Sequence, residues 1–316
     1  MNQKVFFSLE AARGQFGPCA LSIGNFDGVH IGHQALLAFA QRYASNLRVS
    51  LAVLTFHPHP AVFVAPHRVP EMICSLEERL RRLTAAGAER ILVLPFNGDV
   101  ARLTAEQFVS RIISEGLRAK AVFVGENFRF GYKRSGDPQT LERLGEQHGF
   151  TAHFLKPVKF RGRIVSSSLI RQDLTAGKVS SAGRMLGRCF SLEGPVVSGH
   201  GVGKKETVPT VNLRAVPGQL TPRGVYVTET FETSTGRHWP SITNVGCRPT
   251  FGGDELTIET FFLTPFEGRT PEHIQIHFRF YLRAERKFPT PADLKAQIMK
   301  DVARAKSYWR RVPSLY

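Results

Sequence analysis

Cysteine is scarce in this chain, and its few copies are scattered. The four cysteines among 316 residues are Cys19, Cys74, Cys189 and Cys247, and no two of them form a CxxC pair. This spacing argues against a structural zinc site and against the disulfide framework of a small secreted protein. A reducing compartment, the cytoplasm, is therefore the expected location.

Long hydrophobic runs are also missing. No apolar stretch approaches the ~20 residues that a membrane-spanning helix requires. The first residues, MNQKVFFSLEAARG, contain only the short apolar run VFF, which is too short for the core of a signal peptide. We therefore expect neither a leader segment nor a membrane partner.

Acidic residues are outnumbered by basic ones. The chain has 42 Lys and Arg against 26 Asp and Glu, which gives a formal net charge of +16. This excess suits anionic ligands such as nucleotides, phosphorylated cofactors or nucleic acid, without choosing among them. The basic residues form no long block, so a generally basic surface is a simpler interpretation than a nucleic-acid interface. A chain of this length with 42% hydrophobic residues is expected to form two domains.

Residues 21–37, LSIGNFDGVHIGHQALL, join an apolar run to a helical pattern through a Gly-rich turn. The apolar run predicts a buried strand, and the spacing of Ile31, Leu36, Leu37 and Ala40 predicts a helix. The turn therefore lies at a helix N-terminus, where free N–H groups and the helix dipole attract anions.

Glycines and two histidines make this turn a candidate phosphate site. Gly24 and Gly28 let the backbone approach a phosphate without a Cβ in the way. His30 and His33 are three residues apart, so they share one face of a helical turn. Both can hydrogen-bond a triphosphate and, if protonated, neutralise it. The alternative interpretation is a Gly-rich turn with two solvated histidines.

Farther along the first half, apolar runs alternate with helical patterns. Strands are predicted at 50–56, 90–94 and 121–124, and capping boxes that start helices are predicted at Ser75 and Thr104. This alternation predicts a mostly parallel sheet with helices on both faces. In such sheets, ligands bind beyond the carboxyl ends of the strands.

Two loops with unusual composition follow predicted strands directly. The first, TFHPHP at 55–60, contains His57 and His59, which have no carboxylate or thiolate neighbours, so we do not expect a metal site there. The second, GENFRFGYKRSGD at 125–137, is polar, Gly-rich and aromatic, and its rings offer faces on which a flat ligand can stack. The alternative is that its phenylalanines cap the domain core.

The second half of the chain changes character near Gly187. A short helix is predicted over 175–186, and β-type runs separated by Gly and Pro turns follow it, which is typical of a small antiparallel barrel. One helix closes the chain, with Thr290 as its N-cap and Pro291 at its first position. Three apolar residues at helical spacing are predicted to form its apolar stripe: Leu294, Ile298 and Val302.

Motifs in both halves resemble those of the bacterial bifunctional riboflavin kinase/FAD synthetases. GNFDGVHIGH at 24–33 is similar to the HxGH signature of nucleotidylyltransferases, and IVSSSLIR at 164–171 is similar to the ISSTxIR motif of the same enzymes, with Ser168 in place of the usual Thr. In the second half, PTVN at 209–212 and NVGCRPTF at 244–251 are similar to the PTxN and NxGxRPTF motifs of riboflavin kinases. The resemblance covers nearly the whole chain, in the family's motif order.

The resemblance implies an architecture and two reactions. It implies an α/β nucleotidylyltransferase domain (Rossmann-like, HxGH type) at 1–186 and a small antiparallel β-barrel riboflavin kinase domain with a C-terminal helix at 187–316. The barrel would transfer the γ-phosphoryl group of ATP to riboflavin, giving FMN and ADP. The first domain would transfer AMP from ATP to FMN, giving FAD and pyrophosphate.

The resemblance also implies roles for individual residues of the first domain. His30 and His33 would be catalytic. ATP would be bound by six residues: Gly24, Phe26, Asp27, Gly28, Ser167 and Arg171. FMN would be bound by five residues: Pro58, His59, Pro60, Asn127 and Phe130.

In the second domain, the resemblance places Glu259 as the catalytic base and Thr210 and Asn212 on Mg²⁺ with ATP. Hard oxygen ligands two residues apart on one face of a strand suit this ion. Further ATP contacts are Gly201, Gly203 and Lys204, and a further flavin contact is Arg248. Lys204 stands where the family has Arg, and Glu206–Thr207 replace Leu–Gly; Lys keeps the charge but loses the bidentate fork. The alternative function is therefore a nucleotidylyltransferase with weak or lost kinase activity.

Two other functions compete with this interpretation. One is nucleotidyl transfer to another acceptor, as in a cytidylyltransferase or a pantetheine-phosphate adenylyltransferase, but such an enzyme would have no use for the PTVN barrel. The other is a nucleic-acid binder, whose binding would be strongly salt-dependent and independent of flavin. No aromatic–basic stripe of the base-stacking type is evident, so no nucleic-acid partner is expected.

Overall fold

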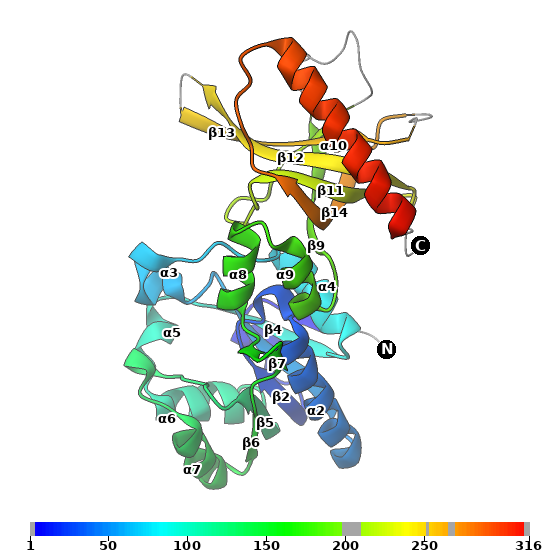
Figure 1. The fold of residues 1–316 in the computed structure, drawn as a ribbon. Coiled ribbons are helices and arrows are strands. Elements are labelled where there is room, and N and C mark those ends of the chain that lie inside the picture. The colour runs from blue at the N-terminus through cyan, green and yellow to red at the C-terminus, as the bar shows by residue number, and fades with distance from the viewer. Residues whose placement is uncertain (1–3, 198–209, 251–252, 265–268, 313–316) are drawn as a thin grey trace. The chain divides into compact units, whose positions relative to one another are not determined.

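The chain divides into two units, Met1–Ser167 and Ser168–Tyr316, in a computed structural model (Figure 1). The structure describes residues 4–197, 210–250, 253–264 and 269–312, without the side chains of 248–250 and 253–255. Within these ranges, no helix is both long enough and apolar enough to cross a bilayer. The order of an α/β unit followed by a β-barrel unit is the predicted one.

A six-stranded parallel sheet forms the centre of the first unit. Its strands are β1 (Lys4–Phe6), β2 (Cys19–Ile23), β3 (Ser50–His57), β4 (Arg90–Pro95), β5 (Ala119–Gly125) and β6 (Thr151–Leu155). Their spatial order is β1-β4-β3-β2-β5-β6, with every neighbouring pair parallel. From β2 the chain builds outward first through β3 and then, in the other direction, through β5. Open α/β sheets bind ligands at such a switch point.

Alternate residues of these strands pack on opposite faces of the sheet. In β2, Leu21 and Ile23 belong to one buried cluster and Ala20 belongs to the other. The first face is covered by α1 (Leu9–Ala12), α6 (Ala105–Phe108) and α7 (Pro138–His148). The second face is covered by α2 (Ile31–Leu47) and α4 (Leu76–Ala85). The prediction of helices on both faces is confirmed.

Helix caps and short turns occupy the connections between these elements. Thr104 and Gln107 form the predicted reciprocal capping box. At α4 only half of the box exists: the Ser75 hydroxyl accepts from the Glu78 N–H at 3.1 Å, but the Glu78 carboxylate pairs with Arg82 instead. The remaining short elements of this unit are η1 (Asp27–Val29), α3 (Ala61–Val64), η2 (Pro66–Arg68), α5 (Gly98–Arg102), η3 (Val109–Ser114), η4 (Tyr132–Arg134), β7 (Lys159–Phe160) and β8 (Arg163–Ile164).

A closed antiparallel barrel forms the second unit. Its strands are β9 (Phe190–Val197), β10 (Thr210–Leu213), β11 (Gly224–Glu232), β12 (His238–Thr250), β13 (Gly253–Phe262) and β14 (His273–Arg283), arranged as β10-β13-β12-β11-β14-β9. The helix predicted over 175–186 is wrong in its boundary. α8 (Ser167–Thr175) and α9 (Val179–Leu186) are separate helices, because Gly177 at φ +73° interrupts them.

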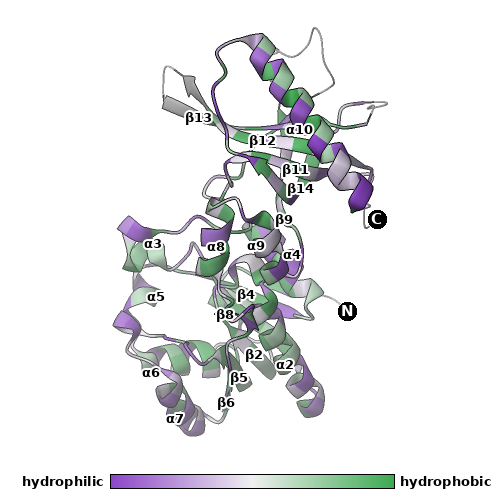
Figure 2. Cartoon of the chain, viewed as in Figure 1, coloured by the Kyte–Doolittle hydropathy of each residue, from purple (hydrophilic) through white to green (hydrophobic). Residues whose placement is uncertain are grey.

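The C-terminal helix α10 (Pro291–Arg311) begins as predicted, with the Thr290 hydroxyl accepting from the Asp293 N–H at 3.2 Å. The predicted apolar stripe is wrong in its first half, because Leu294 is 43% exposed and Ile298 is 40% exposed. The helix packs on the barrel through its later residues, Val302 and Ala305 among them. Figure 2 accordingly shows hydrophilic and hydrophobic residues mixed along α10.

Candidate active sites

The loop that follows β2 has an unusual backbone. Phe26 is fully buried at φ +50°, Gly28 is at φ +76°, and the β-branched Val29 is at φ +40°. Left-handed conformations at non-Gly residues cost free energy and occur most often at functional sites. The loop ends at His30, whose Nδ1 accepts from the His33 N–H at 3.3 Å and so caps α2.

The two histidines of the HxGH motif stack on each other at the start of α2. The ring centroids of His30 and His33 are 3.6 Å apart with an interplanar angle of 14°, and the Phe26 ring packs edge-on to His33 at 5.1 Å. Burial, with His30 as a second cause, holds the pKa of His33 well below its usual value. The His33 Nδ1 is buried and has no hydrogen-bond partner among the described residues. The turn therefore presents a neutral His33 imidazole, whose Nδ1 can form a further hydrogen bond.

Asp27 faces the protein rather than the helix N-terminus. It is 1% exposed, and its carboxylate accepts from the Ile73 N–H at 3.0 Å and, at 3.4 Å, from the Cys74 N–H. Its backbone carbonyl accepts from the Ser167 hydroxyl at 3.0 Å. The predicted ATP residues Asp27 and Ser167 are thus brought together, with Arg171 one helical turn after Ser167 in α8.

A cavity of about 950 Å³ lies beyond the carboxyl ends of β2, β3, β4 and β5. Five residues predicted to bind ATP or FMN line it: Gly24, His59, Pro60, Asn127 and Phe130. These residues come from three separate loops, which the switch point of the sheet brings together. Pro58, also predicted here, precedes His59 in the chain but does not line the cavity.

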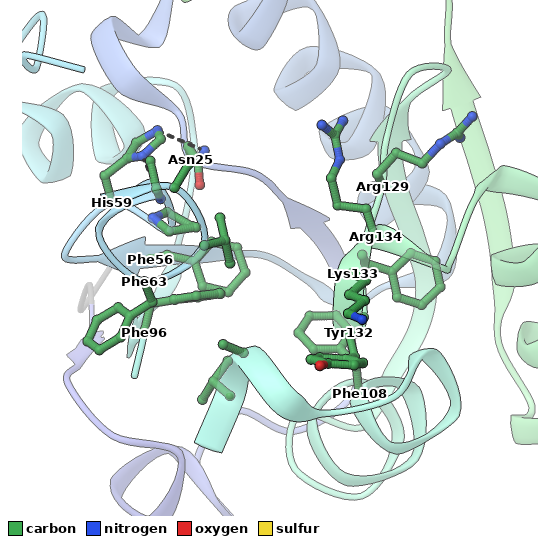
Figure 3. A pocket seen from close by; sticks show the side chains of 18 of the residues that line it. Asn25, Phe56, His59, Phe63, Phe96, Phe108, Arg129, Tyr132, Lys133 and Arg134 are labelled. Atoms are coloured by element: carbon green, nitrogen blue, oxygen red, sulfur yellow. Dashed lines mark hydrogen bonds between the residues drawn. The ribbon is translucent and has the colours of Figure 1, made fainter. Parts of the chain in front are cut away.

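Aromatic rings form two walls of this cavity. Phe56, Phe63 and Phe96 lie on one side, with Phe96 in contact with both other rings, and Phe108 and Tyr132 lie on the other (Figure 3). The motifs did not assign Phe63, Phe96 or Phe108 to a ligand site, because all three stand outside the recognised motifs. The space between the walls suits a flat, largely apolar ring system.

The two phenylalanines of the loop after β5 both line the cavity and contact the core of the unit. Phe128 and Phe130 stack at 5.5 Å, and both line the cavity. Phe130 is also 6% exposed and belongs to the core of the sheet's first face, and Phe128 packs against that core. Capping the core and lining the cavity are therefore not exclusive.

Polar and basic groups ring the cavity. The side-chain amide of Asn25 lies 3.2 Å from the His59 Nε2, and the His59 Nδ1 accepts from the Ala61 N–H at 3.1 Å (Figure 3). Arg102, Arg129, Lys133 and Arg134 are the cationic lining residues. A ligand with a flat apolar body and an anionic group matches this combination.

Arg79 is a buried cation that no recognised motif contains. It is 2% exposed, and its Nη1 donates to the Asn25 carbonyl at 2.8 Å and to the Phe56 carbonyl at 3.3 Å. Burial lowers the pKa of Arg79, against the opposing effects of Cys74 and Asp27. Its position in SLEERLRRL is itself a signal, because an Arg three residues after Leu76 lies on the apolar face of the helix.

In the barrel, three polar residues stand in one row across neighbouring strands. Glu259 of β13 is directly opposite Asn212 of β10 on one side and Asn244 of β12 on the other. Directly opposite residues point to the same face of a sheet, and Thr210 shares that face because it is two residues from Asn212. The predicted kinase residues of β10 and β13 are therefore adjacent.

Four predicted residues of the kinase site have no described side chain. Gly201, Gly203 and Lys204 lie outside the described residues, and Arg248 is described only as a backbone position of β12, opposite Glu255. Where side chains are described, no group of three or more His, Cys, Asp or Glu could hold a metal ion. Thr210 and Asn212, which are predicted to bind Mg²⁺, carry hydroxyl and amide oxygens and belong to none of these four residue types.

Comparison with known proteins matches both halves of the chain. A family model described as FAD synthetase matches residues 13–169, and one described as riboflavin kinase matches residues 186–309. A bifunctional riboflavin kinase/FMN adenylyltransferase of Pseudomonas fluorescens is 34% identical over 300 residues, which are 95% of this chain and 96% of the relative. The protein of the same name from Escherichia coli strain K12 is 34% identical over 92% of this chain and 93% of its own length.

A solved structure is similar over almost the entire length. It is a crystal structure titled as a macrolide-efflux protein from Streptococcus pneumoniae, with a TM-score of 0.86 and 25% identity, covering 99% of this chain and 100% of the other. The likeness extends through the α/β unit, the barrel and the terminal helix.

Proposed function

Because the chain belongs to the family of bifunctional riboflavin kinase/FMN adenylyltransferases, we propose that it phosphorylates riboflavin to FMN and then adenylylates FMN to FAD, with ATP as the donor in both steps. The kinase is assigned to residues 187–316 and the adenylyltransferase to 1–186. Four free cysteines fit a reducing compartment, so we place the enzyme in the cytoplasm.

For the kinase step, Glu259 is the proposed base. It would accept the proton of the terminal ribityl hydroxyl as that oxygen bonds to the γ-phosphorus and the bond to the bridging oxygen of ADP breaks. Its neighbours in the row, Asn212 and Asn244, are supporting amides that can orient its carboxylate or the substrate hydroxyl. This assignment needs no protein nucleophile.

Mg²⁺ is proposed to accompany ATP at β10. The donor set fits, because the Thr210 hydroxyl and the Asn212 amide oxygen are hard ligands on one strand face beside the Glu259 carboxylate. The ion would supply charge neutralisation for the phosphates.

For the adenylyl step, a phosphate oxygen of FMN would attack the α-phosphorus of a second ATP, and pyrophosphate would leave. His30 and His33 at the N-terminus of α2, together with Ser167 and Arg171, are proposed to bind and neutralise the phosphates. FMN would lie in the 950 Å³ cavity, with its ring between the aromatic walls and its phosphate directed toward Gly24. Positioning and electrostatics then provide the catalysis.

One observation carries this proposal: residues of three separate loops that the family motifs single out line one cavity at the switch point. The test is a time course with purified protein, riboflavin, ATP and Mg²⁺, with the flavins separated. FMN appearing before FAD supports both activities. In a second time course, FMN is supplied directly. If this FMN becomes FAD while riboflavin stays unchanged in the first, the kinase half of the proposal fails; if neither flavin changes, the whole proposal fails.

A further inference from the structure

The loop after β2 lies between the cavity and the stacked histidines. One continuous segment, Ile73–Arg79, forms hydrogen bonds to this loop. Its first two residues bond the Asp27 carboxylate through their N–H groups, and the Cys74 Sγ accepts from the Gly28 N–H at 3.3 Å. Its last residue, Arg79, donates to the Asn25 carbonyl at 2.8 Å. The same segment therefore holds Asp27 and Gly28, which lead into the stacked histidines, and Asn25, which lines the cavity.

Arg79 joins the ends of two strands. Besides the Asn25 carbonyl after β2, its Nη1 contacts the Phe56 carbonyl in β3 at 3.3 Å and the Thr55 hydroxyl at 3.4 Å. The Thr55 hydroxyl itself donates to the Asn25 carbonyl at 3.1 Å. Asn25 and Phe56 both line the cavity, so this guanidinium links the backbone of two cavity-lining residues.

Burying the charged Arg79 side chain costs desolvation free energy, although it holds two backbone carbonyl groups. The Arg79 side chain is 2% exposed, and its Nε has no hydrogen-bond partner among the described residues. Burying a charge without a full set of partners is costly, so packing alone does not account for an Arg here. What Arg79 provides is one charged donor atom, Nη1, placed between two strand ends, where it contacts the Asn25 carbonyl, the Thr55 hydroxyl and the Phe56 carbonyl.

We propose that Arg79 is a positioning residue for adenylyl transfer, which aligns the acceptor cavity with the nucleotide-binding turn by clamping Asn25 and Phe56. It touches neither substrate and acts through the Asn25–His59 pair at the cavity edge (Figure 3). The inference rests on the proposed function of the first unit. It assigns an effect on FMN binding to Arg79, a buried residue that does not line the cavity.

The test compares Arg79→Lys and Arg79→Met with wild type in the full-length protein. We expect the KM for FMN to rise about tenfold or more and kcat to fall in Arg79→Met, because charged hydrogen bonds to both carbonyls are lost. Arg79→Lys should recover part of this. The KM for ATP should change by less than about twofold, because the hydrogen bonds of Arg79 go to Asn25, Thr55 and Phe56 and not to the α2 helix that carries the stacked histidines.

Matched controls separate positioning from loss of fold. Arg82→Met removes a half-exposed Arg one turn away in the same helix and should leave all constants unchanged. Thr55→Val removes the second donor to the Asn25 carbonyl at nearly constant volume, so it should raise the KM for FMN even if Arg79→Met fails to fold. Riboflavin phosphorylation by the barrel unit provides an internal measure of the amount of protein, and thermal melting of the first unit shows whether that unit is folded.

The outcomes are distinct. A higher KM for FMN in Arg79→Met and Thr55→Val, with unchanged riboflavin phosphorylation, supports the proposal. An unchanged KM for FMN in Thr55→Val, or in a folded Arg79→Met, would overturn it, as would equal changes in the constants for FMN and ATP. If wild type itself made no FAD from FMN, the proposed function would fail instead.

Discussion

The Ser167 hydroxyl donates a hydrogen bond to the Asp27 carbonyl at 3.0 Å, although 140 residues separate the two in sequence. Asp27 belongs to η1, the turn that leads into the stacked histidines, and Ser167 is the first residue of α8. One hydroxyl thus connects the first and last motifs of the α/β unit. Motifs that are distant in sequence therefore meet at the turn that leads into α2.

Replacing Ser167 by Ala should therefore affect adenylyl transfer specifically. We expect FAD formation from FMN to fall about tenfold or more, because a phosphate donor and the support of η1 are both lost. Ser167→Thr, which keeps the hydroxyl, should retain most of the activity. FMN formation from riboflavin is the control, and an equal loss of both activities would contradict the two-site assignment.

The lowered pKa of His33 predicts the pH dependence of stability. In the unfolded chain an ordinary histidine takes up a proton near pH 6.5, whereas the folded protein resists protonation at His33. His33 therefore contributes no penalty above that pH and destabilises the folded state progressively as pH falls below it. The melting temperature of the first unit should fall between pH 7 and pH 5.

His33→Gln should reduce this acid sensitivity. The remaining slope would come from His57 and His153, whose pKa values are also lowered chiefly by burial. Thermal melts of wild type and variant across this pH range provide the measurement. Parallel loss of stability in the two proteins would show that His33 does not titrate as proposed.

Glu259→Gln should remove the kinase step while preserving adenylyl transfer. The amide cannot accept the hydroxyl proton, so we expect the rate of FMN formation to fall by about 10²-fold or more. Gln keeps nearly the same volume, and the row with Asn212 and Asn244 can be retained. FMN supplied directly should still become FAD, and an undiminished kinase rate would exclude Glu259 as the base.

Phe128 and Phe130 should respond differently to truncation. Phe130→Ala should lower the free energy of unfolding by about 3–5 kcal/mol, because Phe130 is 6% exposed and packs on Phe108. Phe128→Ala should cost less stability, about 1–2 kcal/mol, since Phe128 is only partly buried. It should raise the KM for FMN, and chemical denaturation with flavin titration measures both effects. Equal stability losses would contradict this division.

The order of elements could be predicted because local patterns agree with the fold. The apolar run at Cys19–Ile23 is β2 in full, and Thr104 and Gln107 form the capping box that their types indicate. The motifs also predicted which loops meet, since parallel strands place their carboxyl ends at one edge. Where a local signal was weak, as at Thr175 and Gly177, a helix boundary was misplaced.

Other features depend on tertiary contacts that no local pattern encodes. The inward orientation of Asp27 depends on the N–H groups of residues 73–74, which are distant in sequence. The walls formed by Phe63 and Phe96 depend on how the loops after β3 and β4 pack. Leu294 and Ile298 have the spacing of a buried stripe, yet the barrel is contacted by the later turns of α10. Spacing predicts a face, but not how far along a helix that face is covered.

Closure of the barrel affects where strands of two protein molecules can pair with each other. β9 pairs with both β10 and β14, so within the described residues the barrel offers no unpaired strand for another chain to extend. The parallel sheet, in contrast, ends at β1 and β6, which each have one neighbour. Intermolecular strand pairing during refolding or concentrated storage should therefore begin at the edges of the α/β unit, where solubilising substitutions would be most effective.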